Sequence, residues 1–587
     1  MAEARRGSAH ISPDCRGTNF WRTDPGLRAL LGLYLDAPTL AHLTPHYDAF
    51  GEVAGGRLDE LAEAADKNPP VLRARDRFGR DEDRIEYHPA YHEMARIAFG
   101  DLGLHRVGHR PGGFGLDRPL PPLAKYAFTY LFTQAEFGLM CPVSLSDTAA
   151  YVIDRFAGRP LKDYLLPRML HEDPAEMWTG TQFMTEKSGG SDVGVLESTA
   201  ERVGVDEDGL DVWTLTGDKW FCSHTDADVA LVLARPAGKG PGTRNLALFA
   251  MPRRRKDGSR NAYRIARLKD KLGTRSMASG EILLNGATAY LVGAEDAGFK
   301  QMMQQVNQSR LSNAVRSAAM MRRSWNEALT VARHRVAFGG PLVDKPLMRR
   351  QLMKILLPTE QALSAVCWTA ATMERAEAGA DAAAAVLRLL TPLLKFRVCR
   401  DNVRVAAGAM EVRGGNGYIA DWVHARLYRD AELGTIWEGT SSVTALDVVG
   451  RAVGRQGGER PLAAALHALA AEVPGPYAQT LGDLIDRVAA LAAKAGADAA
   501  REDDYRTVAG ALYHVTTAVL LAAEGARLGA GGGDARRLLM SRLVVAERLT
   551  ANDPLDPPDR TWQAPVVAAL LDDAPVSLES ATSMITG

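Results

Sequence analysis

The sequence predicts an α+β fold that is mostly α-helical, with one β-rich segment between two helical regions. Three changes in pattern support this prediction. Apolar residues recur at helical spacing from about Asp24 to Phe156, alternate with polar residues from about Met177, and return to helical spacing from Gly298. We therefore expect an N-terminal α-helical domain, a middle β domain, a C-terminal four-helix bundle and an additional C-terminal helical domain.

The domain boundaries are placed where the pattern changes. Residues 1–23 are polar and are expected to form a flexible N-terminus. The expected domains are 24–176 (N-terminal α-helical), 177–293 (β), 294–455 (helical bundle) and 456–587 (additional α-helical).

The individual elements follow from local patterns. The segments 211–217, 229–234, 245–250 and 281–284 alternate as strands do and are separated by glycine-rich turns. Three long helical patterns, 311–338, 346–378 and 382–410, are expected to pack as antiparallel helices of a bundle. A glycine cluster at 529–533 and a Pro/Asp-rich segment at 553–558 interrupt the alanine- and leucine-rich C-terminal helices.

Composition favours an ordinary globular protein. Hydrophobic residues make up 46% and charged residues 24% of the 587 residues, and the net charge of −1 gives no general preference for nucleic acid or membrane surfaces. The five cysteines are scattered without a CxxC pair, which indicates a reducing compartment and no metal site. We expect a cytoplasmic protein, because no secretory signal is recognisable and the best apolar run, 382–396, is interrupted by charges and a proline.

The first candidate for chemistry is the segment Ile436-Trp437-Glu438-Gly439-Thr440. A carboxylate lies between a bulky aromatic and a glycine, and the following Thr-Ser-Ser cluster is able to cap a helix. If Glu438 is held against the indole of Trp437 and away from water, its pKa is raised and it can act as a base near neutral pH. The alternative is a solvated glutamate in a turn.

The second candidate is a loop with two adjacent glycines, Gly189 and Gly190, between Ser188 and Ser191. Backbone N–H groups in such a loop can bind an anion such as a pyrophosphate, and Thr185 adds a hydroxyl nearby. The segment is not a GxGxxG fingerprint and lacks that motif's strand-then-helix setting. A plain turn is the alternative.

The third candidate ends a predicted strand. Alternation places Phe221 and Ser223 on the same face, where they could cover a flat ring system and bond to one of its heteroatoms. An ordinary β-core is the alternative for this strand end.

Two further segments belong to the helical bundle. Arg335 and Phe338 stand in an Arg-x-x-Phe-Gly sequence at the end of a long helix, where the arginine is able to pair with a phosphate or to favour the helix dipole. Gly414 and Gly415 open a Gly-Gly-Asn-Gly segment that is either a close-approach loop for a nucleotide or a helix stop.

In this order and spacing, the segments resemble the acyl-CoA dehydrogenase family over roughly residues 120–455. The resemblance is greatest to the AidB-type (alkylation-response) branch, which also shares Tyr-His-Pro-Ala-Tyr-His at 87–92, Leu-Met-Cys-Pro at 139–142 and Lys-Asp-Lys-Leu-Gly at 269–273. The long C-terminal extension is similar to that branch as well. The resemblance implies the fold described above, an FAD between the β domain and the bundle, and a homotetramer or homodimer.

The resemblance also implies roles for individual residues. Glu438 matches the base that removes the α-proton of an acyl-CoA, while the hydride leaves the β-carbon for flavin N5. The implied FAD-binding residues are Met184, Thr185, Gly190, Ser191, Phe221, Ser223, Trp437 and Thr440, with Arg335, Phe338, Gly414 and Gly415 acting across a subunit boundary. An electron-transfer flavoprotein is the expected electron acceptor.

Three positions depart from the pattern of the family. Ala337 stands where a polar residue is usual, and Pro346 and Glu411 stand where glutamine is usual. These positions contact the ADP part of FAD across subunits in the family, so the departures concern the binding of FAD and leave Glu438 unaffected.

Three other functions remain open: an AidB-like flavoprotein with weak dehydrogenase activity that binds double-stranded DNA in an alkylation-damage response, an oxygen-using flavin enzyme of the same fold, and a degenerate flavoprotein with little turnover. The AidB-type proteins are associated with double-stranded DNA, but residues 451–587 hold 13 Lys and Arg against 17 Asp and Glu, which disfavours binding to phosphates. An oxygen-using flavin oxidase or monooxygenase of the same fold is the second alternative, and retention of Glu438 argues against it. The acyl group is not readable from the sequence.

Overall fold

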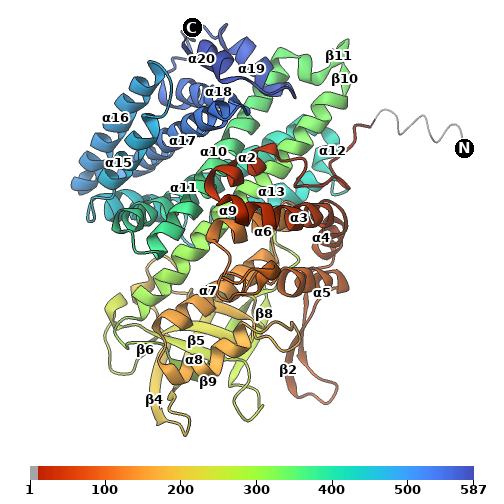
Figure 1. Ribbon diagram of the computed structural model, residues 1–587. Coiled ribbons are helices and arrows are strands. Elements are labelled where there is room, and N and C mark those ends of the chain that lie inside the picture. The colour runs from red at the N-terminus through yellow and green to blue at the C-terminus, as the bar shows by residue number, and fades with distance from the viewer. Residues whose placement is uncertain (1–10, 587) are drawn as a thin grey trace, which may run out of the picture. The chain divides into compact units, whose positions relative to one another are not determined.

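The computed structural model describes residues 11–586 and divides them into two compact units. Unit 1 contains residues 11–55, 122–134 and 313–586, and unit 2 contains residues 56–121 and 135–312. Helices precede and follow a β-rich segment along the chain, which confirms the predicted fold class (Figure 1). These units divide the expected segment 24–176 between them and group the C-terminal helices with the bundle in unit 1.

A seven-stranded sheet forms the centre of unit 2. Its strands are β3 (Gly180–Phe183), β4 (Thr199–Val205), β5 (Asp211–Ser223), β6 (Val229–Pro236), β7 (Ala247–Pro252), β8 (Tyr263–Leu268) and β9 (Ser279–Leu291). The order is β3-β6-β4-β5-β9-β7, with β8 on β9 and a further pairing of β6 with β7 that closes the sheet on itself. The four predicted strands are present as β5, β6, β7 and β9, whereas β3, β4 and β8 were not predicted.

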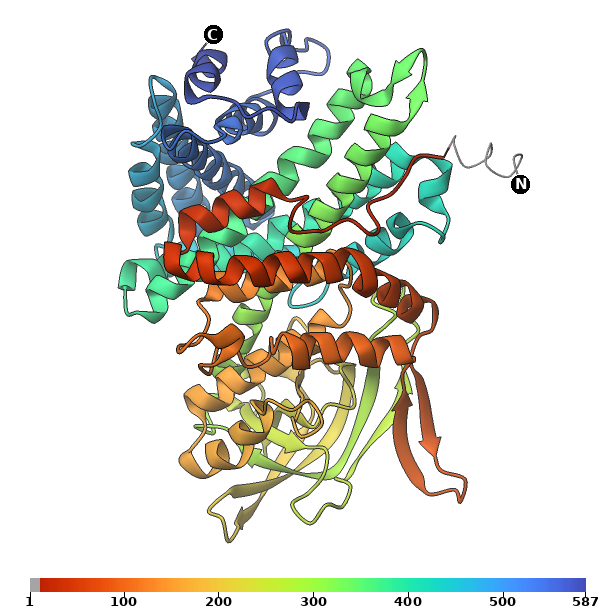
Figure 2. The same cartoon turned by 45° about the vertical axis from the view of Figure 1, so that its right-hand side comes forward.

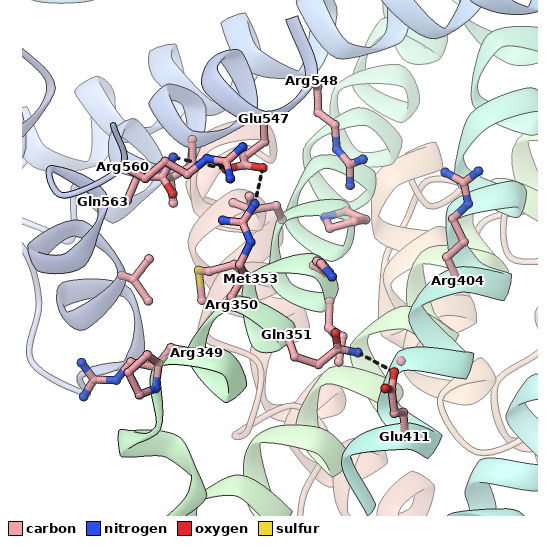
Figure 3. A pocket seen from close by; sticks show the side chains of 18 of the residues that line it. Arg349, Arg350, Gln351, Met353, Arg404, Glu411, Glu547, Arg548, Arg560 and Gln563 are labelled. Carbon is pink, nitrogen blue, oxygen red and sulfur yellow. Dashed lines mark hydrogen bonds and ion pairs between the residues drawn. The ribbon is translucent and has the colours of Figure 1, made fainter. Parts of the chain in front are cut away.

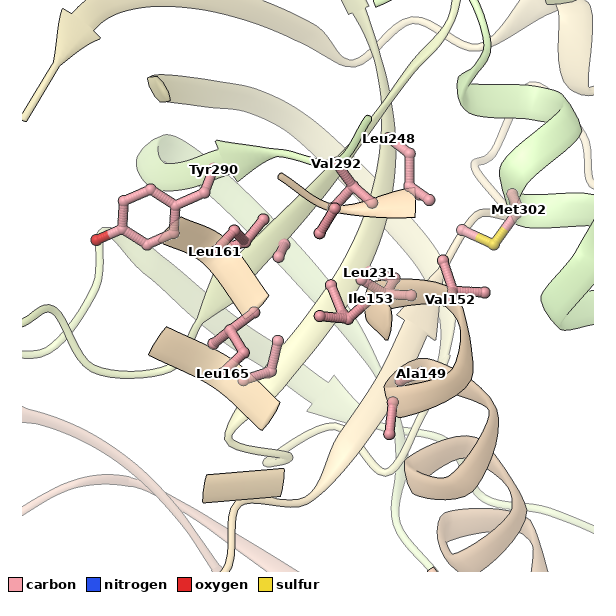
Figure 4. Packing of buried hydrophobic residues seen from close by; sticks show 14 of the residues in the cluster. Ala149, Val152, Ile153, Leu161, Leu165, Leu231, Leu248, Tyr290, Val292 and Met302 are labelled. Carbon is pink, nitrogen blue, oxygen red and sulfur yellow. The ribbon is translucent and has the colours of Figure 1, made fainter. Parts of the chain in front are cut away.

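Two helices cover one face of this sheet (Figure 1). Helices α7 (Met140–Phe156) and α8 (Arg159–Met169) bury apolar side chains against strand residues such as Leu231 and Leu248 (Figure 4). A second apolar cluster, which includes Trp213 and Phe249, is built mainly from the strands of the closed sheet. The sheet is therefore packed on both faces, and its strand ends are left to carry the polar candidate residues.

The rest of unit 2 contains a hairpin that the sequence did not reveal. Strands β1 (Val71–Arg75) and β2 (Asp81–Glu86) pair in an otherwise helical segment. Both strands are rich in arginine and acidic residues, so the alternation of apolar and polar residues that predicts a strand is missing here. Around the hairpin lie α4 (Asp59–Lys67), α5 (Pro89–Ala95) and the π-helix η2 (Arg96–Asp101).

Unit 1 is helical except for one short hairpin. Helix α9 (Gly298–His334) enters it from unit 2 and is followed by the short hairpin β10 (Val336–Ala337) and β11 (Gly340–Pro341), then by α10 (Pro346–Glu377), α11 (Asp381–Arg413) and α13 (Val423–Gly434). Helices α2 (Pro25–Tyr34), α3 (Ala37–Val53) and α6 (Pro122–Thr133) also belong to this unit, and the β10–β11 hairpin extends beyond the ends of α9 and α10 (Figure 2). The predicted helix to residue 338 ends at His334, because Phe338 and Gly339 adopt positive φ in the hairpin.

The C-terminal helices are α15 (Glu459–Ala470), α16 (Tyr477–Ala497), α17 (Tyr505–Ala530), α18 (Arg536–Val544), α19 (Gln563–Leu571) and α20 (Leu578–Thr586). By length and composition alone, residues 499–530 would suffice to cross a membrane. In the structure, 94% of the most apolar stretch of this segment is buried, as expected of a helix in the core of a protein.

Residues 11–23, which were expected to be flexible, are packed within unit 1. Phe20 and Trp21 are buried, and the backbone N–H of Cys15 donates to the Glu327 carboxylate at 3.2 Å. Arg413, at the end of α11, donates to the carbonyl oxygens of Ser12 and Pro13. The segment is polar on average, so its composition did not predict the few residues that are buried. Residues 1–10 of the predicted flexible segment lie outside the described residues.

Candidate functional site

Glu438 lies in the turn between α13 and α14 (Ser441–Ala445), and its backbone φ is +59°. A positive φ is unfavourable for a residue with a Cβ, and such conformations are found disproportionately at functional sites. Gly439 follows with a φ of +100°, a value that glycine accommodates readily. Thr440 occupies the N-cap position of α14, but its side chain makes no capping hydrogen bond, contrary to the expectation from the Thr-Ser-Ser cluster.

Two buried cations hold this turn. The Lys395 ammonium, on α11, donates to the carbonyl oxygen of Gly439 at 2.9 Å. The guanidinium of Arg316, on α9, lies 5.0 Å from the centre of the Trp437 ring. Both side chains are almost fully buried, whereas Glu438 is half-buried.

The sequence did not predict that two buried positive charges lie beside the turn that contains Glu438. Burial disfavours the ionised carboxylate, whereas nearby positive charges favour it. Cys399 lies in the same environment, with its thiol 3.3 Å from the Ser317 hydroxyl. Burial, the largest influence, raises the pKa of Cys399 despite the charge of Lys395, so this thiol stays protonated and is a poor nucleophile.

In unit 2, the glycine–serine loop follows β3 and lies beside the end of β5. The N–H of Trp220 donates to the Thr185 carbonyl oxygen at 2.8 Å, and the Thr181 hydroxyl donates to the Ser223 carbonyl oxygen at 2.6 Å. A Cβ on Gly190 would lie 2.9 Å from the Thr185 hydroxyl oxygen, so a glycine is favoured at this position. The structure thus brings together the predicted residues of both segments.

A buried ion pair anchors the same loop. The Lys219 ammonium, on β5, lies 2.5 Å from the Glu186 carboxylate, which also accepts from the N–H groups of Glu197 and Ser198. Although burial opposes ionisation of Glu186, Lys219 and these hydrogen bonds hold its pKa below the usual value. The pair fixes the start of the loop to β5 and thereby positions Thr185 beside Phe221 and Ser223.

The two predicted ring contacts differ in exposure. Phe221 is 58% exposed and Ser223 is half-buried, while Cys222 between them is fully buried, as strand alternation requires. The Lys269 ammonium lies 4.8 Å from the centre of the Phe221 ring. Because Lys269 is itself paired with Glu281 at 2.6 Å, its charge is balanced, and the exposed ring beside a hydroxyl offers one face to a planar ligand.

In unit 1, Arg335 and Gly414 meet. The Arg335 guanidinium lies 3.4 Å from the position that a Cβ on Gly414 would occupy, and Gly414 has a φ of +75°. Phe338 is 91% exposed at the tip of the β10–β11 hairpin. These residues face outward from the chain, which agrees with the cross-subunit role that the resemblance implies.

The residues present fit a dinucleotide such as FAD. The N–H of Gly189 donates to the Glu186 carbonyl oxygen at 3.1 Å, so Gly190 and the exposed Ser191 are the residues of this loop that suit a phosphate. Phe221 supplies an uncovered aromatic face. Whether the candidates of unit 2 and those of unit 1 contact one flavin stays a prediction. Among the described residues, no group of three or more His, Cys, Asp or Glu side chains is arranged to bind a metal.

Sequence reasoning missed three residues at these sites: Arg316, Lys395 and Lys219. Each is a buried cation within an apolar or helical pattern. An interruption of an apolar face by a lone Lys or Arg is the signal that could have found them, because such residues are seldom fully buried without a partner.

Three family models match this chain. Residues 11–173 match the AidB N-terminal domain of adaptive response proteins, residues 181–287 match the middle domain of acyl-CoA dehydrogenases, and residues 296–454 match the C-terminal domain of acyl-CoA dehydrogenases.

Two curated proteins and one solved structure are similar over most of their length. AidB of Escherichia coli (strain K12) is 36% identical over 412 residues, which cover 68% of this chain and 72% of that protein. Acyl-CoA dehydrogenase family member 11 of Caenorhabditis elegans is 32% identical and covers 73% of this chain and 70% of that protein. The crystal structure of Caenorhabditis elegans ACDH-11 in complex with C11-CoA has a TM-score of 0.84 at 26% identity, covering 92% of this chain and 93% of that one.

Proposed function

Since this chain belongs to the acyl-CoA dehydrogenase family, we propose that it is an FAD-dependent dehydrogenase that forms the α,β double bond of an acyl thioester, with Glu438 as the base. The observation that carries this proposal is the turn at Glu438. Glu438 has a positive φ, and its two neighbours are each held by a buried cation, Gly439 by Lys395 and Trp437 by Arg316. This supports the role of base that the resemblance of the Trp-Glu-Gly-Thr segment implies for Glu438.

Each group in this turn has a role in removing the proton. Glu438 accepts the proton from the carbon next to the thioester carbonyl, and its own backbone N–H is the proposed donor to the carbonyl oxygen as enolate charge develops. Lys395 fixes the Gly439 carbonyl and so orients the turn. Arg316 lies against the ring of Trp437, the residue before the base, and so supports the other side of the turn.

The candidates of unit 2 would position the cofactor. Ser191 and the N–H groups around Gly190 suit the pyrophosphate, while Phe221 and Ser223 suit the flavin ring. FAD, when bound, supplies the acceptor for the hydride from the β-carbon. A CoA thioester as substrate is supported by the ACDH-11 complex with C11-CoA, although the acyl chain of this protein's own substrate stays open.

The electron acceptor and the assembly are also proposals. We expect an electron-transfer flavoprotein to reoxidise the enzyme and the chain to form a homotetramer or a homodimer. The outward position of Arg335 and Phe338 supports a subunit contact near them.

The test is anaerobic bleaching of the FAD-loaded protein by a panel of acyl-CoAs of increasing chain length. Glu438→Gln should slow bleaching by about 10²–10⁴-fold, because a general base of this kind contributes that factor. The matched control is Glu432→Gln, which alters a carboxylate on the same segment. If Glu438→Gln bleaches as fast as the unaltered protein, Glu438 is not the base; if no acyl-CoA bleaches the flavin, the proposed reaction itself is wrong.

A further inference from the structure

A cavity of about 770 Å³ lies within unit 1, between α10, α11, the π-helix η9 (Val545–Leu549) and α19 (Figure 3). Part of its wall is apolar and is formed by Met353 and Leu357 of α10, Leu543 of α18 and Val567 of α19. The volume is that of a small-molecule site.

The rest of the lining is predominantly cationic. Six cations and four carboxylates line the cavity, which gives a net charge of +2. The cations are Arg349, Arg350, Lys354, Arg404, Arg548 and Arg560, and the carboxylates are Asp344, Asp401, Glu411 and Glu547.

The carboxylates already have partners. Glu547 lies 3.3 Å from Arg350 and 3.7 Å from Arg560, and Asp401 is paired with Arg397 on the same helix at 2.8 Å. Glu411 accepts a hydrogen bond from Gln351 at 3.2 Å, at the other end of the cavity (Figure 3). Little negative charge is left for the remaining cations.

Over residues 11–586, three of these cations, Lys354, Arg404 and Arg548, have no carboxylate within ion-pair distance. The guanidinium groups of Arg404 and Arg548 extend into the space of the cavity (Figure 3). Arg548 stands on a π-helical turn, a rare geometry that occurs frequently at functional sites.

We propose that this cavity binds an organic phosphate, with its phosphate between Arg404 and Arg548 and its apolar body against Met353, Leu357 and Val567. Planar guanidinium groups bind phosphate oxygens in a bidentate manner. A phosphate monoester carries a charge of about −1.5 to −2 at neutral pH, which balances the net charge of the lining. The phosphate belongs either to a nucleotide or to a lipid-like alkyl ester.

The phosphate position differs from the flavin contact that the family pattern implies. Glu411 and Pro346 mark that contact at one end of the cavity. Arg404 precedes Glu411 by seven residues on α11, which corresponds to about two helical turns or roughly 10 Å. The site is therefore proposed to be occupied together with FAD.

The experiment is isothermal titration of the FAD-loaded, full-length protein with three probes: AMP, n-octyl phosphate and inorganic phosphate. We expect AMP or n-octyl phosphate to bind more tightly than inorganic phosphate, and the tighter of the two identifies the source. Arg404→Gln and Arg548→Gln should each weaken that binding by about tenfold or more, because each removes a charged hydrogen bond. Arg487→Gln, an exposed arginine on α16, is the matched control and should leave affinity unchanged.

Three results would overturn the proposal. They are the absence of binding by all three probes, equal affinity of inorganic phosphate and the organic probes, and release of FAD in step with binding of the probe. The last result would mean that the cavity is part of the flavin site. Since Arg404 and Arg548 are exposed, the variants are expected to fold, and the thermal midpoint of each variant checks this.

Discussion

At the scale of single residues, Glu438 combines an unfavourable backbone conformation with a favourable electrostatic setting. Its positive φ costs about 1–3 kcal/mol, which the surrounding contacts must offset. Lys395 binds the next carbonyl group along the chain, and Arg316 supports Trp437. Strain at a defined carboxylate is typical of a residue whose orientation matters for function.

Lys395→Met tests this positioning role. Loss of a nearby positive charge makes the ionised carboxylate less stable, so the apparent pKa for flavin bleaching by an acyl-CoA should rise. Loss of the hydrogen bond to Gly439 should also lower the rate at high pH. The measurement is the bleaching rate across pH.

Lys494→Met, which alters an exposed lysine on α16, is the control and should keep the profile of the unaltered protein. A variant that loses rate equally at every pH, with no movement of the profile, would show that Lys395 is structural and does not influence the base.

At the scale of elements, β5 positions one group of candidates because it is fixed tightly to its neighbours. Gly217, within β5, has a φ of +144°, and a Cβ there would lie 2.4 Å from the Ser198 hydroxyl oxygen. Ser198 in turn donates its N–H to Glu186 at the start of the glycine–serine loop. A close approach of two strands therefore determines where that loop begins.

Gly217→Ala should lower the free energy of unfolding by about 2 kcal/mol or more, because it adds a steric overlap to an unfavourable φ. Gly204→Ala on β4 is the matched control, since Gly204 has a φ of +151° but nothing within 4 Å of its Cβ position. The difference between the two variants in urea unfolding isolates the overlap. Equal losses would mean that the approach to Ser198 is not tight.

At the scale of the whole molecule, a buried network of charges joins the helices of unit 1. Arg322 of α9 lies 2.9 Å from Asp24 and also pairs with Glu360 of α10. Arg537 of α18 lies 2.7 Å from Glu360 and 2.9 Å from Glu524 of α17. This network explains why the C-terminal helices cluster with the bundle in one unit.

Stability in acid should depend on Glu360. Although burial opposes its ionisation, Arg322 and Arg537 lower its pKa from 4.5 to about 2. Because the pKa is lower in the folded state, this contribution to stability is present above about pH 4.5 and is lost as the pH falls toward 2. We expect the free energy of unfolding to fall over this range.

Glu360→Gln should remove part of that pH dependence and should cost about 3–5 kcal/mol at neutral pH, because it leaves two buried arginines with fewer partners. Glu374→Gln, which alters an exposed carboxylate on the same helix, is the control. Urea unfolding at several pH values measures both. A Glu360→Gln variant with the pH dependence of the unaltered protein would contradict the assignment.

The sequence by itself determined the fold class, the long helices α10 and α11, four strands of the sheet and the segments that resemble a flavin site, because these depend on local periodicity and short motifs. Only the tertiary structure revealed the packed residues 11–23, the β1–β2 hairpin and the buried cations beside Glu438. The contacts that fix them join residues far apart in the sequence, such as Lys395 and Gly439 or Cys15 and Glu327. A buried charge is stable only where a partner from another element pairs with it, and no local sequence pattern specifies which residues form that pair.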